Sequence, residues 1–195
     1  MPLRPLLAFA LAAISPALFA QTALAQTDAA TTPADAPATV RVPIGGQAGE
    51  SLSGLAVFTE GPEGVLIRLR INDLPVQARG QWHAVHLHET ADCSGRGFTA
   101  SGGHINPDGR AHGLLNPMGP DTADLPNIWA DAAGNIHAEL YSTAVTVTGA
   151  EGRVPLLDAD GSAIVVHAGP DDHSSQPIGG AGTRIACGAI TAEQR

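Results

Sequence analysis

Six of the eight histidines fall in three short clusters along the chain. They are His83, His86 and His88, then His104 and His112 in a segment rich in Gly and Pro, and finally His167 at the end of an apolar run. Imidazole nitrogens in such numbers suit copper, zinc, iron or nickel, whereas two cysteines are too few for a thiolate site. The residues therefore predict a metal-binding protein.

His86 and His88 are two residues apart in a segment whose pattern is typical of a β-strand. Side chains two apart on a strand point to the same face, so both imidazoles can bind one ion. His83 has the opposite parity and shares its face with Val85 and Leu87. We therefore expect His83 to be a core histidine satisfied by a backbone hydrogen bond rather than a ligand.

The elements that must position these side chains are predicted to be strands. Residues 65–71 alternate, with four apolar side chains on one face and Arg68 and Arg70 on the other. Similar strand patterns occur at residues 55–59, 82–89, 135–147, 163–167 and 183–190. Gly and Pro separate these runs, and no long window has helical periodicity. The pattern predicts an all-β fold, an antiparallel β-sandwich or barrel.

Two long connections interrupt the strand pattern, at residues 90–126 and at residues 168–182. Loops of that length without secondary structure are usually functional or disordered. We expect the first loop to be ordered, because it carries His104, His112 and Cys93, each of which can tie it to the sheet.

The amino-terminal residues predict export. Residues 1–25 combine a positive charge at Arg4, an apolar run at residues 6–13 and a small-residue ending at Ala25 that fits a cleavage site. A membrane anchor is the alternative, but Pro16 and Gln21 interrupt the run before it reaches the roughly 20 residues of a transmembrane helix. We expect residues 1–25 to be a signal peptide, 26–38 a disordered leader and 39–195 one domain, in a periplasmic or secreted protein whose mature chain does not insert into a membrane.

The charge balance limits the partners of the mature chain. Removal of residues 1–25 takes away only Arg4, which leaves 9 basic against 19 acidic residues. The resulting net charge of −10 disfavours nucleic acid and anionic membranes as partners. All the basic residues are arginines.

Cys93 and Cys187 are the two cysteines of the chain. In an exported protein they are expected to form a disulfide, which would stabilise the fold by roughly 4 to 5 kcal/mol in the chain-entropy model. Two free thiols that bind a metal are the alternative.

Six ordered motifs carry a resemblance to a known family. They are HLH (86–88), SGGHINP (101–107), AHG (111–113), DLPN (124–127), VVHAG (165–169) and GTRIACG (182–188). Together they resemble the copper/zinc superoxide dismutases, over residues 55–190. The resemblance implies a Greek-key β-barrel with two long functional loops, and an enzyme that converts superoxide to oxygen and hydrogen peroxide.

The resemblance also implies roles for individual residues. The copper ligands would be His86, His88, His104 and His167. His104 would bridge copper to zinc and exchange a proton while copper alternates between Cu(II) and Cu(I), so the catalytic residues would be His104 and Arg184. Asp171 would link ligands of the two metals, and Cys93 and Cys187 match the disulfide of the family.

The zinc ligands implied are His104, His112, Asp121 and Asp124, but Asp121 stands where the family pattern has a histidine. A carboxylate oxygen is an acceptable zinc donor. However, Asp is shorter than His, so the loop would have to move inward. Three outcomes stay open: zinc bound with Asp121 as ligand, zinc bound weakly with water in the fourth place, or an enzyme with copper alone.

Two other functions remain as alternatives. Four histidines would also serve a periplasmic copper-buffering protein without turnover, although such storage needs neither Arg184 nor Asp171. A zinc hydrolase would need an open zinc position and a carboxylate base, for which Asp121 is a candidate. Exported bacterial members of the family are often dimers, so a homodimer is a further expectation, with Trp129 or Tyr141 as contact candidates or as ordinary core or surface aromatics. His137 and His173 receive no ligand role.

Overall fold

The computed structural model describes residues 37–149 and 152–195. The predicted signal peptide and all but the last two residues of the predicted leader lie outside the described residues. No described helix is both long enough and apolar enough to cross a membrane.

The described chain is built from strands joined by loops and 3-10 turns, with no α-helix among the residues described. The strands are β1 (Thr39–Gly45), β2 (Ser53–Gly61), β3 (Gly64–Asn72), β4 (Trp82–His83), β5 (Val85–His88), β6 (Ile128–Trp129), β7 (Ile136–Ser142), β8 (Val145–Thr146), β9 (Val154–Pro155), β10 (Ser162–His167) and β11 (Arg184–Ile190). The 3-10 turns are η2 (Val76–Ala78), η3 (Arg96–Ser101) and η4 (Ala192–Gln194).

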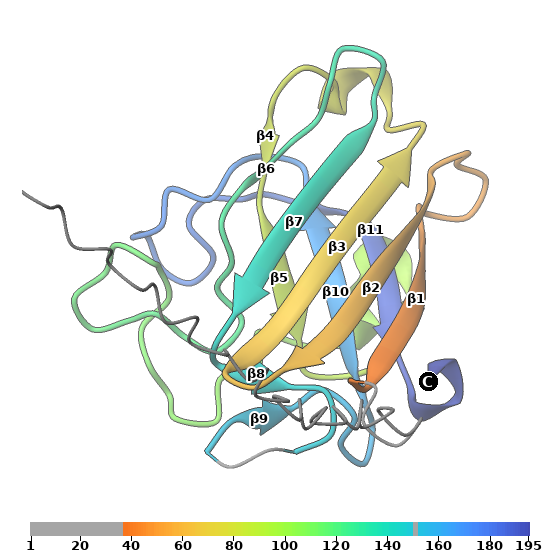
Figure 1. Ribbon diagram of the computed structural model, residues 1–195. Helices are drawn as coiled ribbons and strands as arrows, with labels where there is room; N and C mark the ends of the chain where they lie inside the picture. Colours follow the sequence, from red (N-terminus) through yellow and green to blue (C-terminus); the bar gives the residue numbers. More distant parts are fainter. Residues whose placement is uncertain (1–36, 150–151) are drawn as a thin grey trace, which may run out of the picture. The chain divides into compact units, whose positions relative to one another are not determined.

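One antiparallel sheet of seven strands, in the order β5-β10-β11-β1-β2-β3-β7, makes up most of the fold. Figure 1 shows β1, β2, β3 and β7 in one layer and β5, β10 and β11 in the layer behind it. At one edge of the sheet, β4 is followed directly by β5. β4 also pairs with β6, and a bridge between Ala130 and Ile136 joins the end of β6 to β7 at the other edge. The sheet therefore curls into the predicted all-β Greek-key barrel.

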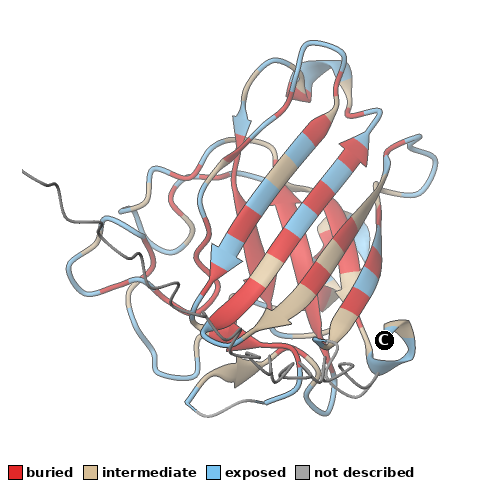
Figure 2. Ribbon diagram, viewed as in Figure 1, coloured by how far each residue is buried: buried red, intermediate tan, exposed pale blue. Residues whose placement is uncertain are grey.

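The core follows from the alternation in the strands. In β3 the apolar residues Val65, Ile67, Leu69 and Ile71 are buried, while Arg68 is exposed. Figure 2 shows the same stripes of buried and exposed residues along β1 and β7. In contrast, β5 and β10 are buried along their whole length, because loops cover their outer face. The histidines of β5 and β10 therefore lie in an environment with little water.

The structure contains each predicted strand, with corrected boundaries. The run at 82–89 is divided at Ala84 into β4 and β5, and the run at 135–147 is divided into β7 and β8. Three strands were not expected: β1, β6 and β9. In β1, Pro43 pairs with Leu55 of β2, and the register with β11 contains only Gly45. Proline has no N–H to donate to a neighbouring strand. Pro43 is tolerated because β1 pairs with β11 only at Gly45, so no hydrogen bond to β11 is needed at position 43.

Both long connections lack named strands, as predicted, since residues 90–126 contain only η3 and residues 168–182 contain no strand. The first loop is held to the barrel by the predicted disulfide between Cys93 and Cys187, whose Cα atoms are 5.7 Å apart. The alternative of two free thiols that bind a metal was therefore wrong. Two isolated bridges, His86 with Asp124 and His88 with His104, also attach this loop to β5.

Candidate metal centre

The predicted site residues come from two buried strands and from the loops that cover them. His86 and His88 lie on β5, His167 ends β10, and His104 is brought beside His88 by an isolated bridge. Antiparallel pairing places Val165 of β10 opposite His86, so the two strands present their histidines at neighbouring positions.

The structure brings the four predicted copper ligands together. His86, His104 and His167 each offer a nitrogen within 4.8 Å of the others. The ring of His88 is 5.3 Å from that of His104 and 5.9 Å from that of His167, measured between centroids, and it lies outside the 4.8 Å group. Each of the four rings has one buried nitrogen without a hydrogen-bond partner among the described residues: His86 Nδ1, His88 Nε2, His104 Nε2 and His167 Nε2.

The other nitrogen of each ring is engaged. His88 Nδ1 is 3.0 Å from the carbonyl oxygen of Gly102, and His167 Nδ1 is 3.1 Å from that of Gly182. His86 Nε2 is 2.9 Å from Asp171 Oδ2. Metal-binding histidines usually have this arrangement, because a hydrogen bond on one nitrogen fixes the tautomer and aims the other at the ion.

A second group lies next to the first and shares His104 with it. It consists of His104, His112, Asp121 and Asp124, whose donor atoms all lie within 4.8 Å of one another. His104 Nδ1 is 3.0 Å from Asp121 Oδ2, and His112 Nδ1 is 2.5 Å from Asp124 Oδ1. Asp121 therefore reaches the group despite its short side chain.

Backbone amides position the two carboxylates. Asp121 Oδ1 accepts a hydrogen bond from the amide of Ala123, which leaves Oδ2 facing His104. Asp124 Oδ2 accepts hydrogen bonds from the amides of Gly113 and Asp121, at 2.7 and 2.9 Å. Its Oδ1 is buried and faces His112 Nδ1.

Asp171 connects the two groups. Its Oδ2 is 2.9 Å from His86 Nε2, and its Oδ1 is 3.0 Å from His112 Nε2. The side-chain amide of Asn127 holds the backbone of Asp171 through two hydrogen bonds of 2.8 Å. Its Nδ2 donates to the carbonyl oxygen of Asp171, and its Oδ1 accepts from the backbone N–H of Asp171. Gly179 lies so close to Asp171 that a Cβ at position 179 would collide with the carboxylate. The position of Asp171 is therefore fixed from several sides.

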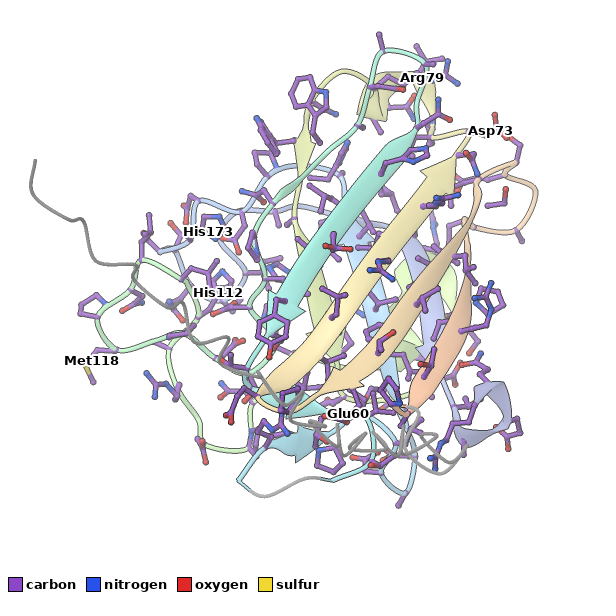
Figure 3. The ribbon with its side chains drawn as sticks, viewed as in Figure 1. Glu60, Asp73, Arg79, His112, Met118 and His173 are labelled. Carbon is purple, nitrogen blue, oxygen red and sulfur yellow. A yellow bond between two sulfur atoms is a disulfide. The ribbon has the colours of Figure 1, made fainter. Side chains whose placement is uncertain are left out.

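Hydrogen bonds join the two long loops around these residues. Gln176 Oε1 accepts from the amide of His112, and its Nε2 donates to the carbonyl oxygen of His112. Figure 3 shows the labelled His112 and His173 on neighbouring loops, with Met118 farther out. The amide of Leu115 donates to the carbonyl oxygen of His173, in agreement with this view. The loops therefore form one wall of the site.

The electrostatics favour neutral imidazoles and ionised carboxylates. Burial lowers the pKa of His88 to about 2 and the pKa of His167 to about 4, and burial also lowers the pKa of His86. Burial acts to raise the pKa of Asp121 and of Asp171, but hydrogen bonds from histidines outweigh it, and both values lie below the usual range. Neutral imidazole and ionised carboxylate are the forms that bind metal ions.

The residues present fit the two implied metals. Four buried imidazole nitrogens without hydrogen-bond partners in the described chain, three of them from rings that offer nitrogens within 4.8 Å of one another, match the preference of copper for nitrogen donors. The second group offers two nitrogens and two carboxylate oxygens, a donor set that zinc accepts in tetrahedral sites.

A cavity of about 410 Å³ opens onto this centre. His88, His104 and His112 line it together with two arginines, Arg184 and Arg110. Arg184 was expected beside the centre, whereas Arg110 was not singled out from the sequence. Two arginines and one aspartate, Asp121, therefore share this cavity with the imidazoles.

The remaining histidines agree with their expected places. His83 is fully buried, and its two ring nitrogens lie 2.8 and 2.7 Å from the carbonyl oxygens of His167 and Ala78. His137 is exposed on β7, opposite Arg70. His173 Nδ1 is 3.4 Å from Asp171 Oδ2, so this residue adjoins the centre without joining either group.

Comparison with known proteins identifies relatives of the chain. Residues 52–190 match the family model described as copper/zinc superoxide dismutase (SODC). A protein of Caulobacter vibrioides named superoxide dismutase [Cu-Zn] is 52% identical over 139 residues, which cover 71% of this chain and 78% of that protein. Superoxide dismutase [Cu-Zn] 2 of Aquifex aeolicus is 44% identical over 137 residues, or 70% of this chain and 78% of the relative.

A solved structure has the same fold. The crystal structure of a SOD-like protein from Bacillus subtilis superposes with a TM-score of 0.71 at 30% sequence identity, and the match covers 80% of this chain and 99% of that one.

Proposed function

The chain belongs to the copper/zinc superoxide dismutase family, and from this membership we propose how its own residues convert superoxide to oxygen and hydrogen peroxide. The observation that carries the proposal is the set of four buried, unpartnered imidazole nitrogens beneath a cavity lined by two arginines. Such a centre combines a redox-metal site with a route for a small anion.

His86, His88, His104 and His167 would hold copper. Bound copper supplies one-electron redox chemistry, which the dismutation of superoxide requires and zinc does not provide. The carbonyl oxygens of Gly102 and Gly182 and the carboxylate of Asp171 keep the rings in orientations that leave these nitrogens free. These contacts therefore orient the rings for metal binding.

Arg184 and Arg110 would bring the substrate to the centre. Superoxide is an anion and the mature chain is strongly acidic, so its approach needs a local positive charge. A guanidinium also offers directed N–H donors to a small anion. His104 would hold a proton at Nε2 and pass it to the reduced product, because this residue lines the cavity and its Nε2 has no hydrogen-bond partner in the described chain.

His104, His112, Asp121 and Asp124 would hold zinc, with Asp121 as a ligand in the position of a histidine. The proposal is supported by the 3.0 Å separation between Asp121 Oδ2 and His104 Nδ1 and by the 2.5 Å separation between His112 Nδ1 and Asp124 Oδ1. Two carboxylates place more negative charge near the copper site than one would, which lowers its attraction for an anion. Arg110, the second arginine of the cavity, would offset part of this loss of attraction for an anion.

We also propose that the protein acts in the periplasm or outside the cell. The disulfide between Cys93 and Cys187 supports this location, because such bonds persist in oxidising compartments. The mass of the protein recovered from a periplasmic fraction tests the proposal, since cleavage after Ala25 gives a chain that begins at Gln26. A full-length mass in the cytoplasmic fraction would contradict it.

The experiment that tests the function measures the disappearance of superoxide with the mature protein loaded with copper and given no zinc. We expect a rate constant near the diffusion ceiling of about 10⁸ to 10⁹ M⁻¹s⁻¹. His86→Ala should abolish the activity, whereas His137→Ala removes an exposed histidine outside the centre and should leave it unchanged.

The outcomes separate the alternatives. A slow rate that zinc restores would mean that the zinc site is needed for turnover. Copper that binds tightly with no turnover, with or without zinc, would favour the periplasmic copper-buffering protein instead. The cavity arginines argue against that function, because storage of a metal needs no anion-binding group.

A further inference from the structure

Three acceptors hold the guanidinium of Arg184. Nη1 donates to the carbonyl oxygen of Phe98 at 2.8 Å and to Ser101 Oγ at 3.0 Å. Nη2 donates to the carbonyl oxygen of Gly102 at 2.7 Å. Two of these acceptors are backbone atoms that almost any sequence would provide, and Ser101 is the one side chain among the three.

The hydroxyl of Ser101 is oriented for this contact. Ser101 is fully buried, and its Oγ donates to the carbonyl oxygen of Phe98 at 2.9 Å. Because the hydroxyl proton is engaged by that carbonyl, the lone pairs of Oγ remain for Nη1 of Arg184. Ser101 and Arg184 are 83 residues apart in the sequence, so the contact exists only in the folded barrel.

The position of Arg184 is linked to the metal centre. The carbonyl oxygen of Gly102 accepts from Nη2 of Arg184 and also lies 3.0 Å from Nδ1 of His88. Phe98, the other carbonyl contact, packs with Cys187 and Val165 in a small buried cluster beside the disulfide. These two carbonyl contacts tie the guanidinium to segments that also hold His88 and the disulfide. Ser101 adds a third contact, which opposes rotation of the guanidinium relative to the imidazoles.

We propose that Ser101 is a positioning residue, which holds the guanidinium of Arg184 in the orientation that binds a small anion in the cavity. The inference rests on the proposed function in taking superoxide as that anion. Loss of the hydroxyl leaves the two carbonyl contacts, so Arg184 stays in place with a less restricted guanidinium. We expect an effect of roughly three- to tenfold, the size of one hydrogen bond to a charged group that is partly compensated.

The first experiment compares Ser101→Ala with Thr99→Ala, which removes a hydroxyl from an exposed side chain of the same turn. Azide is the anion probe, and its dissociation constant is read from the visible spectrum of the copper-loaded proteins. Ser101→Ala should weaken azide binding and slow superoxide disappearance by about three- to tenfold, and Thr99→Ala should change neither. Equal azide affinities in wild type and Ser101→Ala would overturn the proposal.

A double-variant comparison tests whether Ser101 acts through Arg184. In the Arg184→Ala background, Ser101→Ala should have no further effect on azide binding, because the group that it positions is gone. A full additional loss in that background would mean that Ser101 supports the site by another route and would overturn the inference.

A readout without metal keeps this inference separate from the proposed function. In the metal-free protein, restricted rotation should give separate NMR signals for the Nη hydrogens of Arg184. These signals should merge in Ser101→Ala and persist in Thr99→Ala. If the copper-loaded wild type failed to consume superoxide, the proposed function would fall, while the NMR signals and the azide affinities would still decide the role of Ser101.

Discussion

Asp121 would give the proposed zinc site an unusual donor set, and this role can be measured directly. Asp121→Asn keeps the shape of the side chain and removes its charge, so zinc affinity should fall at least tenfold. Copper affinity should change little, because the four nitrogens proposed to bind copper belong to other residues. The dissociation constant of zinc is obtained by competition with a chromophoric chelator.

Asp108→Asn is the matched control, because Asp108 is an exposed carboxylate on the same loop. Unchanged zinc affinity in Asp121→Asn would exclude Asp121 as a ligand. The remaining outcomes would then be a site completed by water or an enzyme that works with copper alone.

The two cavity arginines oppose the negative charge of the whole chain. Salt screens both the attraction by Arg184 and Arg110 and the repulsion by the net charge of −10 expected for the mature chain, so we expect a shallow dependence of the wild-type rate on ionic strength. Arg184→Ala should lower the rate most. Arg110→Ala should lower the rate at low salt and make it rise with added salt, because repulsion then dominates.

Arg41→Ala provides the control for net charge, since Arg41 is exposed on β1 and does not line the cavity. Its salt dependence should stay close to that of wild type. A wild-type rate that falls steeply with ionic strength would mean that the local field of the arginines outweighs the repulsion, contrary to this expectation.

At the scale of elements, the disulfide couples the first long loop to β11. Cys187 lies on β11 three residues after Arg184, and Cys93 precedes η3, which supplies two of the acceptors for Arg184. Replacement of both cysteines by serine should destabilise the fold by roughly 4 to 5 kcal/mol in the chain-entropy model. It should also weaken azide binding, because η3 is then less firmly held.

Urea unfolding and azide titration of the doubly substituted protein measure the two effects separately. If azide affinity and the copper spectrum were unchanged in the folded variant, the proposed coupling between the disulfide and Arg184 would be wrong. A large loss of stability alone would show that the bond serves the barrel and not the site.

The sequence was sufficient for the elements that have a local period. Alternation in β3 and the His-x-His pair on β5 predicted both the strands and the face that carries the site. In β1 the apolar residues also alternate, but Pro43 hides the strand because proline usually excludes one. The two-residue strands β6 and β9 are too short to have a period.

Prediction of the site had a different limit. Histidines and paired carboxylates are rare enough to be noticed in a sequence, and the structure brings them together in three overlapping groups among the described residues. Arg110 and Ser101 belong to common residue types with no informative spacing. Their roles depend on how the loop folds over β5 and β11, so only the tertiary structure could single them out.

At the scale of the whole molecule, the barrel holds neutral imidazoles in its interior, which makes the metal-free protein sensitive to acid. The pKa of His88 is lowered to about 2 and that of His167 to about 4, chiefly by burial, whereas in the unfolded chain a histidine titrates near 6.5. Between those values the unfolded chain binds more protons than the folded one. The free energy of unfolding should therefore be greatest above about pH 6.5 and fall as the pH decreases toward 4.

Each such histidine contributes a slope of up to about 1.4 kcal/mol per pH unit within this window. The lowered pKa of Asp171 acts in the same direction below pH 4, because protonation of that carboxylate removes its hydrogen bonds with the histidines. Urea unfolding of the metal-free protein from pH 7.5 to 4.5 measures the slope, and His137→Ala should not alter it, since His137 is exposed.

Copper should protect the fold over the same range, because protons and the metal compete for the same nitrogens. A metal-free stability that stayed constant between pH 6.5 and 4.5 would mean that the buried imidazoles become protonated without unfolding, and the barrel would then be more permeable to water than its packing indicates.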